Sequence, residues 1–170
     1  MNIDFFQDVE TIILKDKLGR FLGVDDDFVY TFQDVVKLSG HSCPTVAGAY
    51  LMTIKALKEL YKDELPVRGE IRVELRDSKS SGTTGVLANV ASFITGAKEE
   101  DGFKGLQGQY FRNNLLKYEA PIKGDMRFTR LDNQEKVEVL YDLSNISLSG
   151  FDGNLMQKGL QKIATKEELE

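Results

Sequence analysis

The chain has 170 residues, of which 41% are hydrophobic, and a formal net charge of −5. This length and composition predict one globular domain over residues 1–170, and the mixing of acidic with basic residues argues against nucleic-acid binding. The first residues, MNIDFFQDVETIILKDK, contain early acids and a short apolar run, which favours a cytoplasmic protein over a secreted or membrane-spanning one. The single cysteine excludes an internal disulfide and a four-thiolate zinc module within one chain.

The first third of the chain carries signals for one strand and two helices. VETIILKD (residues 9–16) mixes β-branched and polar residues as a strand does. TFQDVVKLSG (31–40) predicts a short helix, with Thr31 as its cap, an acid three positions later and Gly40 at its end. Residues 44–62 predict a longer helix, because apolar residues recur there at spacings of three and four on one face. These residues are Ala47, Tyr50, Leu51, Ile54, Leu57 and Tyr61.

The rest of the chain alternates between strand and helix signals. VRGEIRVELRD (67–77) alternates apolar with charged residues and predicts a half-buried strand, whereas VLANVASFITG (86–96) predicts a second core helix. Three further strands are predicted at 105–120, 125–132 and 136–143, the last two joined as a hairpin by DNQE, and the tail from 154 to 168 is predicted to be helical. This order favours an α+β fold in which a mixed or antiparallel sheet packs against two main helices.

The only histidine and the only cysteine lie together in LSGHSCPTVAG (38–48). Proline favours the first position of a helix and an extended residue before it, so Cys43 is expected at the helix start, where a thiolate is stabilised. If residues 40–43 are extended, His41 and Cys43 point to the same side and suit a borderline or soft metal. The alternatives are a small buried cysteine beside a hydrogen-bonded histidine, and a Cys–His nucleophilic pair.

Two ligands do not complete a zinc site. With no other histidine or cysteine in the chain, a third ligand must be a carboxylate, a hydroxyl or a group from a second subunit.

Two segments carry a family resemblance. SGHSCPTVAGAYLMTIKAL (39–57), with Gly-His-x-Cys-Pro before a glycine and a long helix, resembles the opening of the FmdE family, which is named after a component of formylmethanofuran dehydrogenase. GVLANVASFITGAKEEDGFKGL (85–106) resembles its second landmark, a helix ending in Thr-Gly before a glycine- and lysine-containing loop. The resemblance implies an FmdE-like α+β homodimer that holds a metal, commonly zinc, at His41 and Cys43. The chain is most similar to free-standing bacterial members without a zinc ribbon, many of which have no known biochemical role.

The chain also departs from the fuller FmdE motif. Val86, Asn89 and Ser92 stand where fuller members have a cysteine, an aspartate and a glutamine, and Ala97 replaces a frequent cysteine after Thr-Gly. Because these changes remove ligands and an acid or base, the resemblance favours binding over catalysis.

Two glycine-containing loops offer further contacts for a ligand. RDSKSSGTTG (76–85) opens the second core helix and presents backbone N–H groups, with Lys79 adding charge, although the order of residues is not that of a phosphate-binding Walker loop. GFKGLQG (102–108) lacks the dinucleotide fingerprint, but Phe103 and Lys104 are candidates to line a cofactor pocket.

The leading hypothesis is therefore a homodimeric protein that binds a divalent metal or a metal-containing cofactor through His41 and Cys43. Haem is one version, since a single histidine or cysteine can be its axial ligand in an apolar dimer groove. The alternatives are a metal- or thiol-dependent enzyme acting on a small anionic substrate near Lys79 or Lys104, and an accessory component of a redox complex.

Overall fold

A computed structural model describes residues 8–24, 27–142, 144 and 153–169. The chain divides into two compact units, one of residues 5–141 and one formed by residues 1–4 and 142–170. The smaller unit contains the helices α5 (Gly153–Leu160) and α6 (Lys166–Leu169), as expected for a helical tail. None of the helices in the described part of the chain has both the length and the apolar character of a membrane span.

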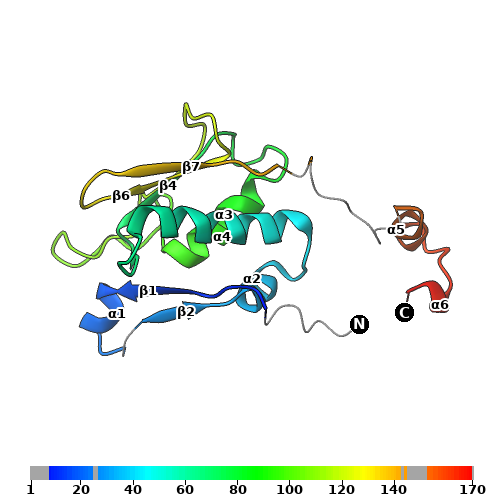
Figure 1. The fold of residues 1–170 in the computed structure, drawn as a ribbon, viewed down its shortest axis with the longest axis horizontal. Helices are drawn as coiled ribbons and strands as arrows, with labels where there is room; N and C mark the ends of the chain where they lie inside the picture. Colours follow the sequence, from blue (N-terminus) through cyan, green and yellow to red (C-terminus); the bar gives the residue numbers. More distant parts are fainter. Residues whose placement is uncertain (1–7, 25–26, 143, 145–152, 170) are drawn as a thin grey trace. The chain divides into compact units, whose positions relative to one another are not determined.

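The larger unit has two sheets with helices between them (Figure 1). One sheet has the strand order β2-β1-β3 and the other β5-β4-β6-β7. The first contains β1 (Ile12–Asp16), β2 (Phe28–Tyr30) and β3 (Val67–Arg68), and the second contains β4 (Ile71–Leu75), β5 (Leu116–Lys117), β6 (Met126–Arg130) and β7 (Lys136–Val139). The α+β prediction is therefore confirmed, with two sheets where one was expected.

Four helices belong to this unit. The two longest, α3 (Pro44–Tyr61) and α4 (Thr84–Thr95), lie between the sheets, and the shorter ones are α1 (Lys17–Phe21) and α2 (Phe32–Ser39). The cap of α2 is the predicted one, because Thr31 and Asp34 form a reciprocal capping box and Gly40 ends the helix in the left-handed conformation. Gly96 ends α4 in the same way.

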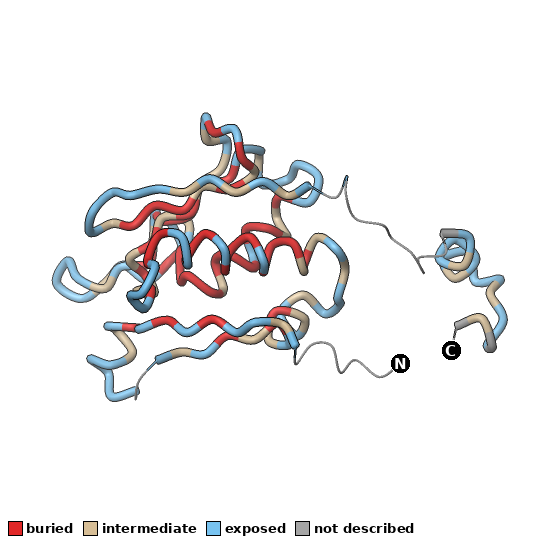
Figure 2. The backbone as a smooth tube through the Cα atoms, in the orientation of Figure 1, coloured by how far each residue is buried: buried red, intermediate tan, exposed pale blue. Residues whose placement is uncertain are grey.

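Helix α3 is buried on more than the one face that its spacing predicts. Val46, Ala49 and Thr53 are fully buried, whereas Leu51, predicted to face the core, is 46% exposed. The reason is the layered arrangement, since a helix that lies between two sheets buries opposite sides. Figure 2 shows the resulting band of buried residues along both helices and the inner strands.

Both sheets combine parallel and antiparallel pairs. Strand β1 is antiparallel to β2 and parallel to β3. Strand β4 is antiparallel to β6 and parallel to β5, and β6 forms the predicted hairpin with β7. The alternation in β4 is confirmed, because Ile71, Val73 and Leu75 are fully buried.

The chain passes from one sheet to the other between β3 and β4. Gly69 lies at this crossing with φ +83°, a left-handed conformation that glycine adopts without strain. Its N–H donates to the carbonyl oxygen of Thr95 at 2.8 Å, which holds the crossing against the end of α4.

Three strand predictions need correction. The predicted strand 67–77 is two strands, β3 and β4, which belong to different sheets and are separated by the crossing at Gly69. Of the predicted strand 105–120, only Leu116–Lys117 pairs in a sheet, because a series of left-handed residues turns the chain before it. These are Gly105, Gln107, Gly108, Tyr110 and Asn114. The predicted strand 136–143 ends at Val139, and residue 143 lies outside the described residues.

Candidate functional site

In the segment before α3, Cys43 has the extended backbone that the sequence predicts, whereas Gly40, expected to be extended, is left-handed with φ 74°. Cys43 is the N-cap residue, with φ −127° and ψ 165°, and Pro44 is the first residue of the helix. The extended backbone at Cys43 follows from the proline, which disfavours a helical residue before it. His41 is exposed and Cys43 is half-buried, so the pair lies at the surface end of a helix whose body is in the core.

The His41 ring is oriented by its own backbone neighbourhood. Its Nδ1 lies 2.9 Å from the carbonyl oxygen of Ser39, which can only accept, so Nδ1 carries the proton of the neutral ring and Nε2 keeps the lone pair. The hydrogen bond to Ser39 raises the pKa of His41, and the nearby Cys43 raises it further. The neutral ring thus presents Nε2 as the nitrogen available to a ligand.

The Cys43 sulfur lies where negative charge is favoured. Burial acts to raise the pKa of Cys43, but the N–H of Val46, the His41 ring and the N–H of Thr45 together lower it. The sulfur accepts no hydrogen bond of capping geometry, so the stabilisation comes from the electrostatics of the helix start and of the imidazole. Cys43 therefore ionises more readily than an ordinary cysteine, next to the imidazole of His41.

These two donors suit a metal but do not complete a site. Thiolate sulfur and imidazole nitrogen are ligands for zinc and softer metals. Within the described residues, no group of three His, Cys, Asp or Glu side chains could hold a metal ion. A third ligand of these four kinds is therefore not in place among the described residues.

Tyr141 is the neighbour that connects this segment to a cavity. Its ring lies directly on α3 at Gly48, where an added Cβ would come 2.1 Å from Cε2 of the tyrosine. Burial raises the pKa of Tyr141, and the charge of Cys43 raises it further. Its hydroxyl is buried without a hydrogen bond of good geometry to any described residue, although Thr45 is near enough to lower the pKa somewhat.

The cavity beside Tyr141 has a volume of about 230 Å³. Ser81, Gly82, Thr83 and Thr84, the loop that opens α4, line it together with the tyrosine. The structure therefore brings the Ser/Gly-rich loop singled out by the sequence toward the Cys43 end of α3. Tyr141 connects the cavity to the segment of Cys43, and this tyrosine is not part of any motif in the sequence.

Comparisons with known protein families, with curated proteins and with solved structures find no match to this chain. The resemblance to the FmdE family thus rests on residues 39–57 and 85–106 alone and stays a prediction.

The three other predicted cofactor contacts lie apart from the cavities. Lys79 forms an ion pair with Glu99, and its Nζ lies 5.8 Å from the centre of the Tyr118 ring. Phe103 is 43% exposed, and Lys104 next to it is exposed as well. None of the three lines the cavity beside Tyr141, and their contact with a cofactor stays a prediction.

A buried charge cluster is the feature that sequence reasoning missed. Asp16 binds Arg112 at 2.7 Å and Arg68 at 3.1 Å, at the edge of a larger cavity of about 440 Å³. The residues of these pairs are 96 and 52 positions apart in the chain, so no local pattern connects them.

Proposed function

We propose that the protein binds a divalent metal ion, zinc first among them, or a metal-containing cofactor such as haem, through His41 and Cys43. The observation that carries the proposal is the placement of an imidazole and a stabilised thiolate together at the start of α3. A metal ligand must be deprotonated, and the electrostatics of this helix start favour that form of Cys43.

The second-sphere contact of His41 supports the same interpretation. Histidines that bind metals almost always donate their other ring N–H to a carbonyl, a carboxylate or water, which fixes the tautomer. Nδ1 of His41 makes such a contact to Ser39. The ring is therefore pre-oriented with Nε2 outward.

The proposal includes a homodimer. The chain offers two ligands at an exposed position, and a four-coordinate zinc site requires more. In a two-fold dimer with the segment at the axis, two copies would supply two sulfur and two nitrogen ligands, a set typical of tetrahedral zinc. A bound metal would supply structural cross-linking in that arrangement, and Lewis acidity if a coordination position stays open.

The test is metal analysis by mass spectrometry with an absorption spectrum, on protein purified without oxygen. Wild type is expected to contain stoichiometric metal or a Soret band, and His41→Ala and Cys43→Ala are expected to lose it. Ser42→Ala is the matched control, because it changes the residue between the two ligands without removing either. Light scattering with and without chelator then tests whether the metal holds the dimer together.

Two results would contradict this proposal. One is a folded wild type without metal or chromophore after supplementation with zinc, cobalt and haem. The other is metal retained in both alanine variants.

A thiol-dependent enzyme acting on a small anionic substrate is the second candidate. The observation that favours it is the cavity beside Tyr141, where the Tyr141 hydroxyl lacks a partner among the described residues and Arg76 supplies a positive charge beside Asp77 and Asp125. Turnover that survives chelation and is lost in Cys43→Ser would favour this candidate over metal binding.

A further inference from the structure

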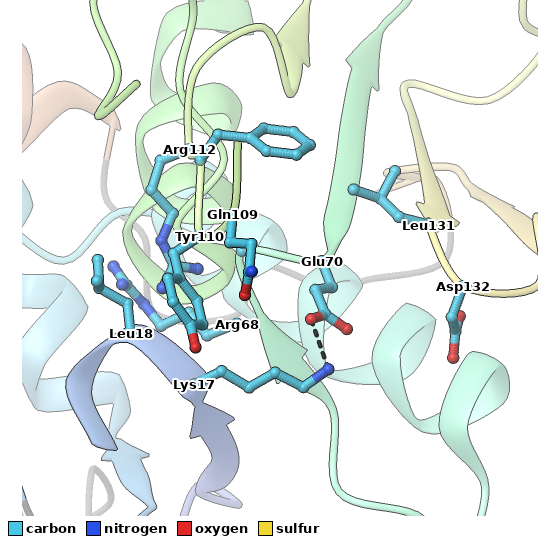
Figure 3. A pocket seen from close by; sticks show the side chains of 11 residues that line it. Lys17, Leu18, Arg68, Glu70, Gln109, Tyr110, Arg112, Leu131 and Asp132 are labelled. Atoms are coloured by element: carbon cyan, nitrogen blue, oxygen red, sulfur yellow. Dashed lines mark hydrogen bonds and ion pairs between the residues drawn. The ribbon is translucent and has the colours of Figure 1, made fainter. Parts of the chain in front are cut away.

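A second cavity of the 5–141 unit lies at the crossing between the two sheets, and it shares no lining residue with the segment of His41 and Cys43. Its volume of about 440 Å³ is within the range of small-molecule sites. In Figure 3 the side chains of Arg68, Arg112 and Tyr110 gather on one side of it. Leu131 lies on the opposite side, with the ion pair of Lys17 and Glu70 between them.

The arginine side of the cavity has more positive than negative charge. Both guanidinium groups bind one carboxylate, that of Asp16, whose side chain is only 4% exposed. The two acids that line the cavity, Glu70 and Asp132, do not offset this excess, because Glu70 is paired with Lys17 and Asp132 with Arg130. The cluster of buried Arg112, half-buried Arg68 and buried Asp16 therefore has one more positive than negative charge next to the cavity.

The same arginines have donors to spare. Nε of Arg68 is buried and has no hydrogen-bond partner among the described residues. Arg112 is 7% exposed, and the hydrogen bond of its side chain within the described part of the chain is the one from Nη2 to Asp16. Burial lowers the pKa of Arg112, and the neighbouring Arg68 lowers it further, in spite of Asp16. A buried charged donor without a partner, such as Nε of Arg68, is costly, and an oxyanion bound to these guanidinium groups would supply acceptors.

The backbone at the crossing leaves space for the side chain of Arg112. A Cβ added to Gly69 would come 1.4 Å from Nη1 of Arg112, so the guanidinium group lies flat against a residue that must be glycine. The side chain of Arg112 thus occupies, beside the cavity, the space that a side chain at position 69 would fill.

The remaining wall combines the polar residues Lys17, Glu70, Gln109 and Asp132 with apolar ones, and it includes one strained aromatic residue. Tyr110 has φ +61°, which is rare for a bulky residue and costs energy unless its surroundings hold it there. The stacked ring of Phe21, 5.4 Å away, is one such contact. Leu18, Phe111 and Leu131 complete the apolar lining.

We propose that this cavity binds a small organic monocarboxylate with an aromatic or branched apolar body, its carboxylate on Arg112 and Arg68 and its body against Tyr110. A carboxylate carries one negative charge, which matches the one unbalanced positive charge, whereas a phosphate monoester carries nearly two at neutral pH. The planar carboxylate also fits the fork of a guanidinium group.

The binding test is calorimetric titration of the full chain with phenylacetate, indole-3-acetate and 4-methylpentanoate. We expect at least one of them to bind with a dissociation constant below about 1 mM. Three compounds serve as controls. Phenylacetamide has the shape of phenylacetate without its negative charge, acetate has the carboxylate without an apolar group, and phenyl phosphate carries a second negative charge. All three are expected to bind at least about tenfold more weakly than the best acid.

Two variants test the assigned residues. Arg112→Gln is expected to abolish binding, but it also removes a partner of Asp16 and can unfold the chain. Tyr110→Gly avoids that difficulty, because it leaves the Asp16 cluster intact and relieves the left-handed backbone, and it is expected to weaken binding about tenfold. Lys104→Ala, in the same loop but outside the lining, and Cys43→Ala are expected to bind as wild type does.

The proposal is wrong if none of the three acids binds. It is equally wrong if phenylacetamide or phenyl phosphate binds as tightly as the acids, or if folded Tyr110→Gly binds as wild type does. Loss of metal from Cys43→Ala with unchanged acid binding would show that the two sites are independent.

Discussion

Replacing Asp16 by asparagine is the most informative test of the buried charge cluster. Asparagine keeps the shape of the side chain and an oxygen that can accept the N–H of Gly19, as Asp16 does at 2.9 Å. The substitution therefore removes the charge without removing the helix cap. It leaves Arg112 and Arg68 without the carboxylate that both of them bind.

The expected cost is large for a single substitution. Removing one partner of a buried ion pair costs about 3–5 kcal/mol, and we expect about 3 kcal/mol because Arg68 keeps its hydrogen bond to the carbonyl oxygen of Phe93. With a urea m value of about 2 kcal/mol per M, the unfolding midpoint would fall by about 1.5 M. Asp132→Asn is the matched control, since Asp132 binds Arg130 at the surface, where its side chain is 49% exposed. It should cost less than about 1 kcal/mol.

The pH dependence provides a second readout of the same variant. Burial acts to raise the pKa of Asp16, but the N–H of Gly19 and the two arginines outweigh it, so the pKa lies below its ordinary value of 3.8. The stabilisation is therefore complete above pH 3.8, declines below it and is gone below the folded-state pKa. The difference in free energy of unfolding between wild type and Asp16→Asn should therefore decrease as the pH falls through that range. The reasoning would be refuted if Asp16→Asn had the same urea unfolding midpoint as Asp132→Asn. It would also be refuted if the difference in free energy of unfolding from wild type stayed constant with pH.

Three further substitutions or reactions test the core and the start of α3. Gly48→Ala should cost about 1–2 kcal/mol in urea unfolding because of its clash with Tyr141, whereas Gly85→Ala, whose Cβ meets nothing closer than 3.5 Å, should be neutral or stabilising. Ser92→Ala should raise the free energy of unfolding by about 1 kcal/mol, since the buried hydroxyl of Ser92 has no partner among the described residues. A decrease of about 1 kcal/mol or more would contradict this prediction. In metal-free protein, iodoacetamide should alkylate Cys43 with a midpoint below its ordinary pKa of 9.0, and His41→Ala should move that midpoint up.

Local signals in the sequence predicted local structure well. The capping pair of Thr31 and Asp34, the proline after Cys43 and the alternation in β4 each act over a few residues, and each is found where expected. The fold class followed from these elements because their order limits how they can pack.

Features that depend on distant residues were not predicted. The second sheet requires β1 to pair with β3, and the cavity requires Arg112 to reach Asp16 across 96 positions. Tyr141 likewise meets Gly48 only through the tertiary fold. The sequence placed His41 and Cys43 correctly relative to α3, but it contained no signal for the tyrosine or the arginines around the two cavities.

The parallel pairing of β1 with β3 has a consequence for how the protein is made. Strand β1 leaves the ribosome early, yet its partners β3 and Arg112 follow much later in the chain. Long-range contacts form slowly because the loop between them must first be closed. We expect the β6–β7 hairpin and the α3–α4 pair to assemble first, with the N-terminal strand docking last. Until then the nascent chain exposes the edge of β1 that does not pair with the nearby β2, which makes this interval the one in which a chaperone matters most.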